Sequence, residues 1–302
     1  MAQSTTPDAA AGQPVTHAVA MAAQERRFSL NRVVVVVVLY LSAFWTLVPM
    51  YWVAVTSVKS MRDLAHIPPR LFPTDIRFDA WVTIIDRRIL ENIFNSLVVA
   101  GIATIICLLV AVPAAYAATR MRLPLKFVGI VVGLMGLVAL LPPIASAIPL
   151  YDLASHLRLI DKKYTLIILY TVLNTAFAVW VLRGTFMDVP MDVEEAALMD
   201  GDTRFGAVRR ILLPLIFPSL FSIAILLFIF NWNEYIIALF FVNSMDTMTL
   251  PIAIQGQIPQ HELDWGVVSA AGTIAIFPVL IAAFTLQRFL VRGLTFGVAS
   301  GQ

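Results

Sequence analysis

Residues 92–119 read NIFNSLVVAGIATIICLLVAVPAAYAAT, a run of 28 positions that contains no Asp, Glu, Lys or Arg. A helix needs about 20 apolar residues to cross a hydrocarbon core about 30 Å thick. The run is continuously apolar, whereas a strand of a membrane barrel alternates over about 10 residues. This stretch therefore predicts a membrane-spanning α-helix.

Five further uncharged runs accompany this one along the chain. The six predicted spans cover about 33–57, 92–118, 127–150, 164–183, 211–234 and 266–288. Hydrophobic residues make up 60% of the 302 residues and charged residues only 13%, against about 45–50% and about 25% in soluble proteins. The sequence therefore predicts an all-α polytopic membrane protein with six transmembrane helices.

The two ends of the chain are predicted to lie outside the bilayer. Residues 1–31 precede the first span, begin with a stretch rich in Ala, Gln, Thr and Pro, and predict a disordered cytoplasmic arm. Six spans place both termini on one side of the membrane. With the termini inside, 12 of the 21 basic residues lie on the cytoplasmic side and 9 outside, which modestly favours this orientation. Residues 293–302 then form a cytoplasmic tail.

Several kinds of chemistry are absent from the sequence. The formal charge of +2 gives no basic excess of the kind that binds nucleic acid. No Gly-Lys dipeptide occurs, so the phosphate-binding loop of many ATPases is missing. The four histidines lack metal-ligand spacing, and no nucleophile-base pair is evident. We therefore predict no catalytic residue and no metal site.

The charged residues gather in one segment, 183–210, which holds six of the 19 acidic and four of the basic residues. Pro190 suits the first turn of a helix, and Met191–Asp200 contains good helix formers with acids toward its N-terminal end. Gly201 suits the left-handed residue that ends a helix. Asp202 or Thr203 can cap a second helix that continues into the fifth span.

The first of these two helices has residues that suit the docking of another protein. Ala196 and Ala197 present a smooth face that another protein can approach closely, and Glu194 and Glu195 form charged rims. The spacing alone also fits an ordinary polar loop that lies on the membrane surface. Residues alone leave both interpretations open.

A longer motif, which includes residues of both helices, resembles the motif of a known family. Glu195-Ala196-Ala197, then Gly201, then Ile211-x-Leu213-Pro214 is similar to the EAA motif of permease subunits of binding-protein-dependent ABC importers. The stretch 230–235, FNWNEY, resembles a signature of the carbohydrate-importer permeases, and the stretch 291–297, VRGLTFG, resembles their C-terminal tail. Together they resemble the second permease of maltose/maltodextrin-like importers. The chain departs from this pattern in having no lysine after the tail and in carrying Asn231 where a small residue is common.

The resemblance implies a type I ABC importer permease fold and a coupling role for the cytoplasmic loop 188–212. It implies docking on an ATPase through Glu194, Glu195, Ala196, Ala197, Asp200, Gly201, Leu213 and Pro214. It also implies that Gly293, Leu294, Thr295 and Gly297 reach toward the ATPase. The implied partners are a second homologous permease, two ATPase subunits and an extracytoplasmic solute-binding protein. ATP and Mg²⁺ would be bound by the ATPase, which leaves this chain without a cofactor.

The expected function is carbohydrate import across the bacterial cytoplasmic (inner) membrane by alternating access, with sugar or polyol as cargo. Asn231, Trp232, Asn233 and Glu234 are candidate walls of the translocation path, since amides and a flat ring suit sugar hydroxyls and ring faces. Helix packing and interfacial placement are the alternative roles of these residues. Two other functions stay open at this stage: an ion-driven secondary transporter, which would need acids within its spans, and a membrane receptor or scaffold.

Overall fold

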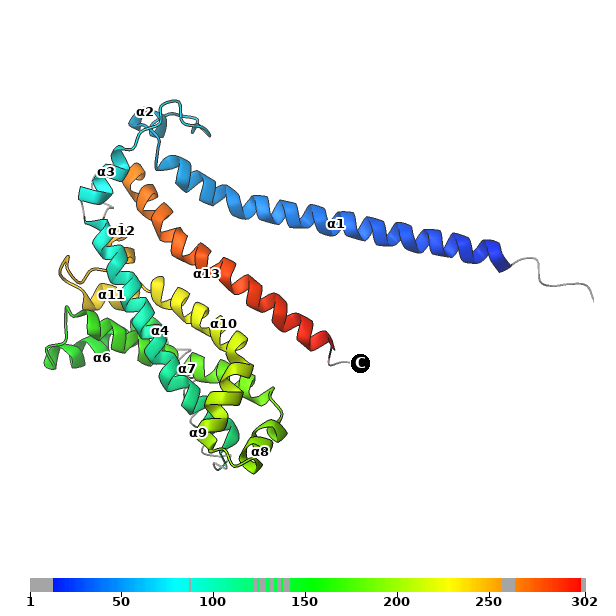
Figure 1. The fold of residues 1–302 in the computed structure, drawn as a ribbon. Helices are drawn as coiled ribbons and strands as arrows, with labels where there is room; N and C mark the ends of the chain where they lie inside the picture. Colours follow the sequence, from blue (N-terminus) through cyan, green and yellow to red (C-terminus); the bar gives the residue numbers. More distant parts are fainter. Residues whose placement is uncertain are drawn as a thin grey trace, which may run out of the picture. The chain divides into compact units, whose positions relative to one another are not determined.

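The computed structural model describes the backbone of residues 13–86, 88–121, 124, 129–130, 133–134, 137, 142–256 and 264–299 (Figure 1). These residues form helices joined by loops. The elements are α1 (Gln13–Thr56), α2 (Met61–Leu64), α3 (Asp79–Asp86), α4 (Ile89–Arg120), α6 (Pro143–His156), α7 (Lys163–Met187), α8 (Met191–Met199), α9 (Arg204–Ala207), the π-helix η1 (Val208–Leu212), α10 (Leu213–Trp232), α11 (Ile236–Phe241), α12 (Leu250–Gln255) and α13 (Trp265–Ala299).

Five helical segments are long and apolar enough to cross a membrane. They are Arg32–Thr56, Ile89–Arg120, Lys163–Met187, Arg204–Trp232 and Trp265–Gln287. The predicted all-helical membrane fold is therefore confirmed with at least five candidate spans. The predicted third span, 127–150, is described only in part, with gaps between residues 127 and 141, and its last part falls within α6.

The chain divides into two units, residues 1–55 and residues 56–302. The first unit holds nearly all of α1, which is helical from Gln13. Here the structure differs from the predicted disordered arm, because residues 13–31 continue the helix of the first span. No Gly or Pro occurs between Val15 and Val48, so no residue of these two types interrupts the helix. Residues 1–12 lie outside the described part of the chain.

In the second unit, α4 and α7 lie side by side and run in the same direction (Figure 1). The Thr171 hydroxyl donates to the Ala103 carbonyl at 3.4 Å, and Arg120 near the end of α4 donates to the carbonyl of Phe186 near the end of α7 at 2.7 Å. Small residues four positions apart allow this close approach. The fully buried ones on α4 are Ala103, Cys107, Ala111 and Ala115. Because the helices are parallel, the chain between them must return from one end of the pair to the other.

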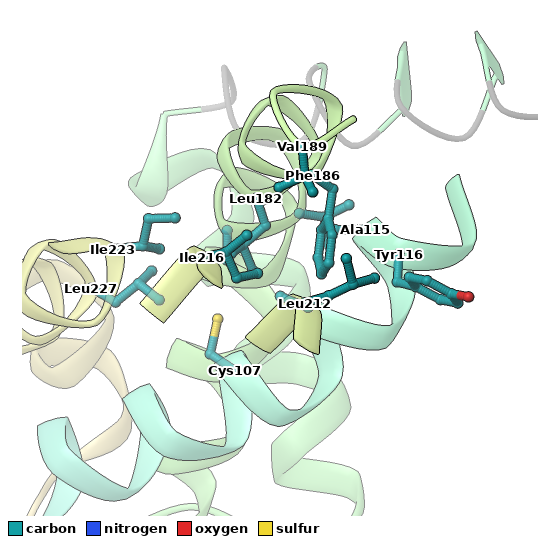
Figure 2. Close-up of a cluster of buried hydrophobic side chains, with 13 residues drawn as sticks. Cys107, Ala115, Tyr116, Leu182, Phe186, Val189, Leu212, Ile216, Ile223 and Leu227 are labelled. Carbon is teal, nitrogen blue, oxygen red and sulfur yellow. The ribbon is translucent and has the colours of Figure 1, made fainter. Parts of the chain in front are cut away.

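A buried apolar cluster joins α4, α7, η1 and α10 (Figure 2). Its members are Cys107, Ala111, Ala115, Tyr116, Ala178, Val179, Leu182, Phe186, Val189, Leu212, Ile216, Ile223 and Leu227. Val189 belongs to the short connection between α7 and α8. The cluster therefore extends from the spans to the base of the loop that carries α8.

At the other end of the second unit, a loop-to-loop contact ties α6 and α7 to the segment after α11. Asp161, which has a φ of 60°, accepts hydrogen bonds from the backbone N–H groups of Asn243 and Ser244 at 3.1 and 3.0 Å. The Thr247 hydroxyl also donates to Asp161. Nearby, α6 and α11 share an apolar cluster that includes Ala147 and Phe241.

The last helix, α13, extends past the predicted sixth span. Its backbone stays helical to Ala299, whereas the sequence predicted a separate tail over residues 293–302. Side chains beyond Gln287 and residues 300–302 lie outside the described part of the structure.

Candidate functional site

The helix α8 lies beyond the end of α4, at the opposite end of the second unit from α2 and α3 (Figure 1). Pro190 precedes it with φ −55° and ψ 141°, and Asp192 and Glu194 lie in its first turn. Acidic side chains are favourable there because the N-terminus of a helix carries a partial positive charge. The predicted short helix is thus confirmed over Met191–Met199.

A glycine turn ends α8 as the sequence predicts. Gly201 has a φ of +89°, a conformation that costs other L-residues roughly 1–2 kcal/mol. The N–H of Asp202 bonds to the Ala197 carbonyl at 3.0 Å, and that of Gly201 to the Leu198 carbonyl at 3.2 Å. This pair of bonds is the Schellman motif, which satisfies the last carbonyls of a helix.

Thr203 begins the second helix of the motif. Its hydroxyl accepts from the N–H of Gly206 at 3.0 Å, which selects Thr203 over Asp202 as the cap. The Asp202 carboxylate instead accepts from the N–H of Thr203 at 2.9 Å and lies 3.6 Å from the Arg210 guanidinium. A β-carbon added to Gly206 would lie only 2.0 Å from Asp202 Oδ1. The turn therefore places a small residue directly against its acidic neighbour.

The second helix continues without a break into a membrane span. The π-helix η1 carries Arg209 and Arg210 and joins α9 to α10. Leu213 is half-buried, and Pro214 is exposed in the first turn of α10. Since α9, η1 and α10 form one helical segment over Arg204–Trp232, the loop motif and the span are directly connected.

The two glutamates of α8 lie in different environments. Glu195 is exposed, as are Ala196 and Asp200. Glu194 is only 7% exposed and Ala197 only 5%. The prediction that both glutamates form charged rims is therefore wrong for Glu194, because its side chain points into the fold rather than outward.

Two side chains of α4 surround the Glu194 carboxylate. The Tyr116 hydroxyl donates to Glu194 Oε1 at 2.5 Å, and Arg120 Nε lies 3.7 Å from Glu194 Oε2. Tyr116 and Arg120 are not among the site residues that the sequence predicts. The only available signal was the position of Arg120 directly after the long uncharged run of α4, where an arginine also serves as an ordinary helix end.

The segment 231–234 lies at the other end of α10. Asn231 is 3% exposed; it accepts from the Asn174 amide at 2.8 Å and donates to the Thr104 hydroxyl at 3.1 Å. These bonds join α10 to α7 and α4. Such bonds contribute about 0.6–2 kcal/mol between membrane helices, so Asn231 packs the helices together.

The remaining residues of this segment also make contacts within the chain. Trp232 is 2% exposed and donates from Nε1 to the Ala275 carbonyl of α13 at 3.2 Å. Glu234 accepts from the N–H groups of Ile237 and Ala238 at 2.9 and 3.1 Å and thereby caps α11. Asn233 is exposed, and its amide donates to the Ile229 carbonyl at 2.8 Å.

A polar loop lies at the same end, between α2 and α3. The fully buried Asp63 carboxylate accepts from Arg70 Nη1 at 2.7 Å and from the hydroxyl and N–H of Thr74 at 2.7 and 2.8 Å. The hydrogen bonds from Thr74, followed by that from Arg70, hold the pKa of Asp63 well below its ordinary value. Nine residues between Ser60 and Asp79, among them Arg70 and Thr74, line a cavity of about 680 Å³.

The predicted tail residues lie near the end of the last helix. The tail residues Gly293, Leu294, Thr295 and Gly297 lie on the helical backbone of α13, but their side chains are outside the described part. Within the described residues, no group of three or more His, Cys, Asp or Glu is placed to hold a metal ion.

The fold is similar to that of a solved importer. It resembles a chain of a bacterial ABC transporter involved in the import of the acidic polysaccharide alginate, with a TM-score of 0.74 and 22% identity over 87% of this chain and 97% of that chain. At 22% identity, this structural similarity shows that the two chains share a fold.

Curated relatives match the chain over most of its length. The sulfoquinovosyl glycerol transport system permease protein SmoH of Agrobacterium fabrum is 33% identical over 84% of this chain and 89% of its own. The diacetylchitobiose uptake system permease protein DasC of Streptomyces coelicolor is 32% identical over 84% and 91%. The trehalose transport system permease protein SugB of Mycobacterium tuberculosis is 30% identical over 85% and 93%.

Residues 111–296 match the family described as the binding-protein-dependent transport system inner membrane component. This range includes α8, the glycine turn and α10. Proteins of this family are multi-pass inner membrane subunits that work with a separate ATPase and a periplasmic binding protein. The chain therefore belongs to the binding-protein-dependent transport system inner membrane components and is a permease subunit of an ABC importer.

Proposed function

We propose that this permease translocates a carbohydrate, either a sugar, an oligosaccharide or a polyol, across the bacterial cytoplasmic membrane. The observation that carries the proposal is the set of relatives at 30–33% identity whose names state uptake of trehalose, diacetylchitobiose or sulfoquinovosyl glycerol. The signature at residues 230–235 agrees with this cargo class.

The proposed assembly contains this chain, a second homologous permease, two ATPase subunits and an extracytoplasmic solute-binding protein. ATP closes the ATPase pair, and α8 transmits that motion to the spans, so that the cavity opens outward to receive sugar. Hydrolysis resets the cycle. The exposed positions Glu195, Ala196, Asp200 and Gly201 form the proposed contact with the ATPase.

The other residues of the loop motif support this contact from within the chain. Glu194 and Ala197 face inward and hold α8 in place, and Leu213 and Pro214 begin the span that receives the motion. We include the tail residues Gly293 to Gly297 as a second contact with the ATPase. A chain truncated after Arg292 should then show lower ATPase activity in the assembled importer, and unchanged activity would remove the tail from the proposal.

The proposed topology has six spans with both termini in the cytoplasm. The parallel direction of α4 and α7 supports one further membrane crossing by the chain between residues 121 and 162. Placing α8 against a cytoplasmic ATPase then sets the loop between α2 and α3 on the outer side, where a binding protein docks.

The segment 231–234 remains a candidate wall of the translocation path. Its exposed member, Asn233, is the one we propose to meet the sugar. Asn231 and Trp232 would hold this wall in position through their bonds to α4, α7 and α13.

The proposed cargo is tested with the purified importer and its binding protein in proteoliposomes. ATP hydrolysis is measured across a panel of mono-, di- and trisaccharides and polyols, with amino acids as the contrast. We expect at least one carbohydrate to stimulate hydrolysis, and only when the binding protein is present. Stimulation by amino acids alone, or by no carbohydrate in the panel, would contradict the proposed cargo.

A further inference from the structure

The small helix α8 buries few of its side chains completely. Of its nine residues, only Glu194 and Ala197 are buried. An alanine offers one methyl group, so packing alone fixes the direction of this helix weakly. The polar contacts of Glu194 therefore add a constraint on how α8 is oriented, beside the glycine turn that ends the helix.

These contacts reach a single turn of α4. The Tyr116 hydroxyl bonds to Glu194 Oε1 at 2.5 Å, while Arg120 Nε lies 3.7 Å from Oε2. The second distance exceeds that of a hydrogen bond, so the pair is held by charge attraction. Both side chains are nearly inaccessible, at 4% for Arg120 and 9% for Glu194. Little solvent is therefore available to screen this attraction.

The same arginine also holds the end of α7. Its Nη2 donates to the carbonyl of Phe186 at 2.7 Å and to that of Val189 at 2.5 Å. Phe186 is in the last turn of α7, and Val189 lies in the connection to α8. One guanidinium thus binds the end of one span, the connection and the helix that follows it.

We propose that Glu194 is a positioning residue of the importer: with Tyr116 and Arg120 it locks α8 to α4 and α7 so that the three move as one body. This inference deepens the proposed function, because it rests on α8 as the ATPase contact. It assigns the two adjacent glutamates separate tasks. Glu195 faces the ATPase, and Glu194 passes the displacement of α8 to the spans.

The positioning role has a direct readout that does not depend on the ATPase. In a Cys107→Ala background, spin labels are placed at Met199→Cys on α8 and at Leu109→Cys on α4, both of which are exposed. Pulsed electron paramagnetic resonance of the intact chain then gives the distribution of distances between the two helices. We expect a narrow distribution for this parent and a broadened one after Glu194→Gln, which removes the charge that faces Arg120.

Further variants distinguish a change in the orientation of α8 from a general loss of the fold. Tyr116→Phe removes one hydroxyl without changing the shape of the ring, and it should broaden the distribution in the same way. The double variant with Glu194→Gln should be no broader than the wider single variant, because both changes break one linkage. Glu195→Gln is the matched control and should leave the distribution unchanged. A narrow distribution in both Glu194→Gln and Tyr116→Phe would overturn the proposal.

The functional consequence is measured in the reconstituted importer as sugar transported per ATP hydrolysed. We expect this ratio to fall about tenfold in Glu194→Gln, because the change removes one partner of a buried charge pair and leaves the Arg120 guanidinium without its counter-charge. An unchanged ratio would overturn the positioning role. Failure of the underlying docking role would look different: the distance distribution would still broaden in Glu194→Gln, but Glu195→Lys would leave ATPase binding intact.

Discussion

Glu194 and Glu195 are neighbours on α8 but lie in opposite environments. Glu194 is 7% exposed and its carboxylate meets Tyr116, whereas Glu195 is exposed. Successive residues of an α-helix are rotated by about 100°, so one can face the fold while the next faces a partner. The chain thus uses one carboxylate inside and leaves the other available at its surface.

Reversing the outer charge should disable coupling and leave the fold intact. We expect Glu195→Lys to insert normally but to lose ATPase binding and uptake, since a mismatched charge at an interface costs several kcal/mol. Co-purification of the ATPase and sugar uptake are the measurements. Asp152→Lys makes the same charge change at an exposed position on α6, outside the loop 188–212, and should retain both. Normal uptake by Glu195→Lys, with ATP hydrolysis still coupled, would show that α8 is not the contact.

The glycine turn gives a test that separates backbone conformation from side-chain size. A β-carbon at Gly201 would meet no atom within 4 Å, so any penalty comes from its φ of +89°. Substituting Val at this position should lower the free energy of unfolding by at least about 1–2 kcal/mol. Substituting Asn should lower it much less, because Asn adopts the left-handed conformation readily. We expect Gly201→Val to lose coupled uptake and Gly201→Asn to keep most of it. Equal uptake by the two variants would argue against a role for the turn geometry.

The buried amide pair should contribute to stability rather than to sugar binding. Asn231→Leu leaves the Asn174 amide and the Thr104 hydroxyl without this partner. The free energy of unfolding should therefore fall by about 0.6–2 kcal/mol. The midpoint of thermal unfolding in detergent should fall, while the sugar concentration for half-maximal ATPase stimulation stays unchanged. Adding Asn174→Leu should recover part of the stability. A changed sugar response at unchanged stability would instead place Asn231 in the path.

The loop between α2 and α3 should respond to acid through Asp63. Its folded-state pKa is held below the ordinary value of 3.8, first by the hydrogen bonds from Thr74, so protonation is harder in the folded chain than in the unfolded one. The stabilisation is therefore complete above about pH 4 and is lost as the pH falls toward the folded-state pKa. Asp63→Asn should lower the unfolding midpoint by a constant amount between about pH 5 and 8, and this difference should shrink below about pH 4.

The matched control for this loop is Asp79→Asn, whose side chain is 83% exposed. It should leave the unfolding midpoint close to that of the parent at every pH. A difference between Asp63→Asn and the parent that stays constant into strong acid would show that the carboxylate is not the titrating group.

The sequence alone predicts the parts of the fold that depend on local chemistry. Long uncharged runs predict the spans, Gly201 predicts the left-handed turn, and the spacing of the loop predicts α8. Each of these depends on residues close together in the chain. Pro190 and Thr203 mark the beginnings of their helices for the same reason.

Contacts between distant residues could not be predicted in this way. Tyr116 and Glu194 are separated by 78 positions, and their meeting depends on α4 and α7 packing in parallel. Periodicity shows that Glu194 and Ala197 share a face of α8, but it does not show that this face points inward. The role of Asn231 cannot be predicted for a related reason. An amide side chain can hydrogen-bond equally well to a sugar or to a neighbouring helix.

We propose that this chain imports a carbohydrate by coupling its spans to an ATPase through α8. The most direct measurement is uptake of a labelled sugar into proteoliposomes that hold the complete importer, with ATP sealed on the ATPase side and the binding protein on the other. We expect uptake that requires both ATP and the binding protein and that is lost in Glu195→Lys. Uptake driven by an ion gradient without ATP, or ATP-dependent uptake that survives Glu195→Lys, would contradict it.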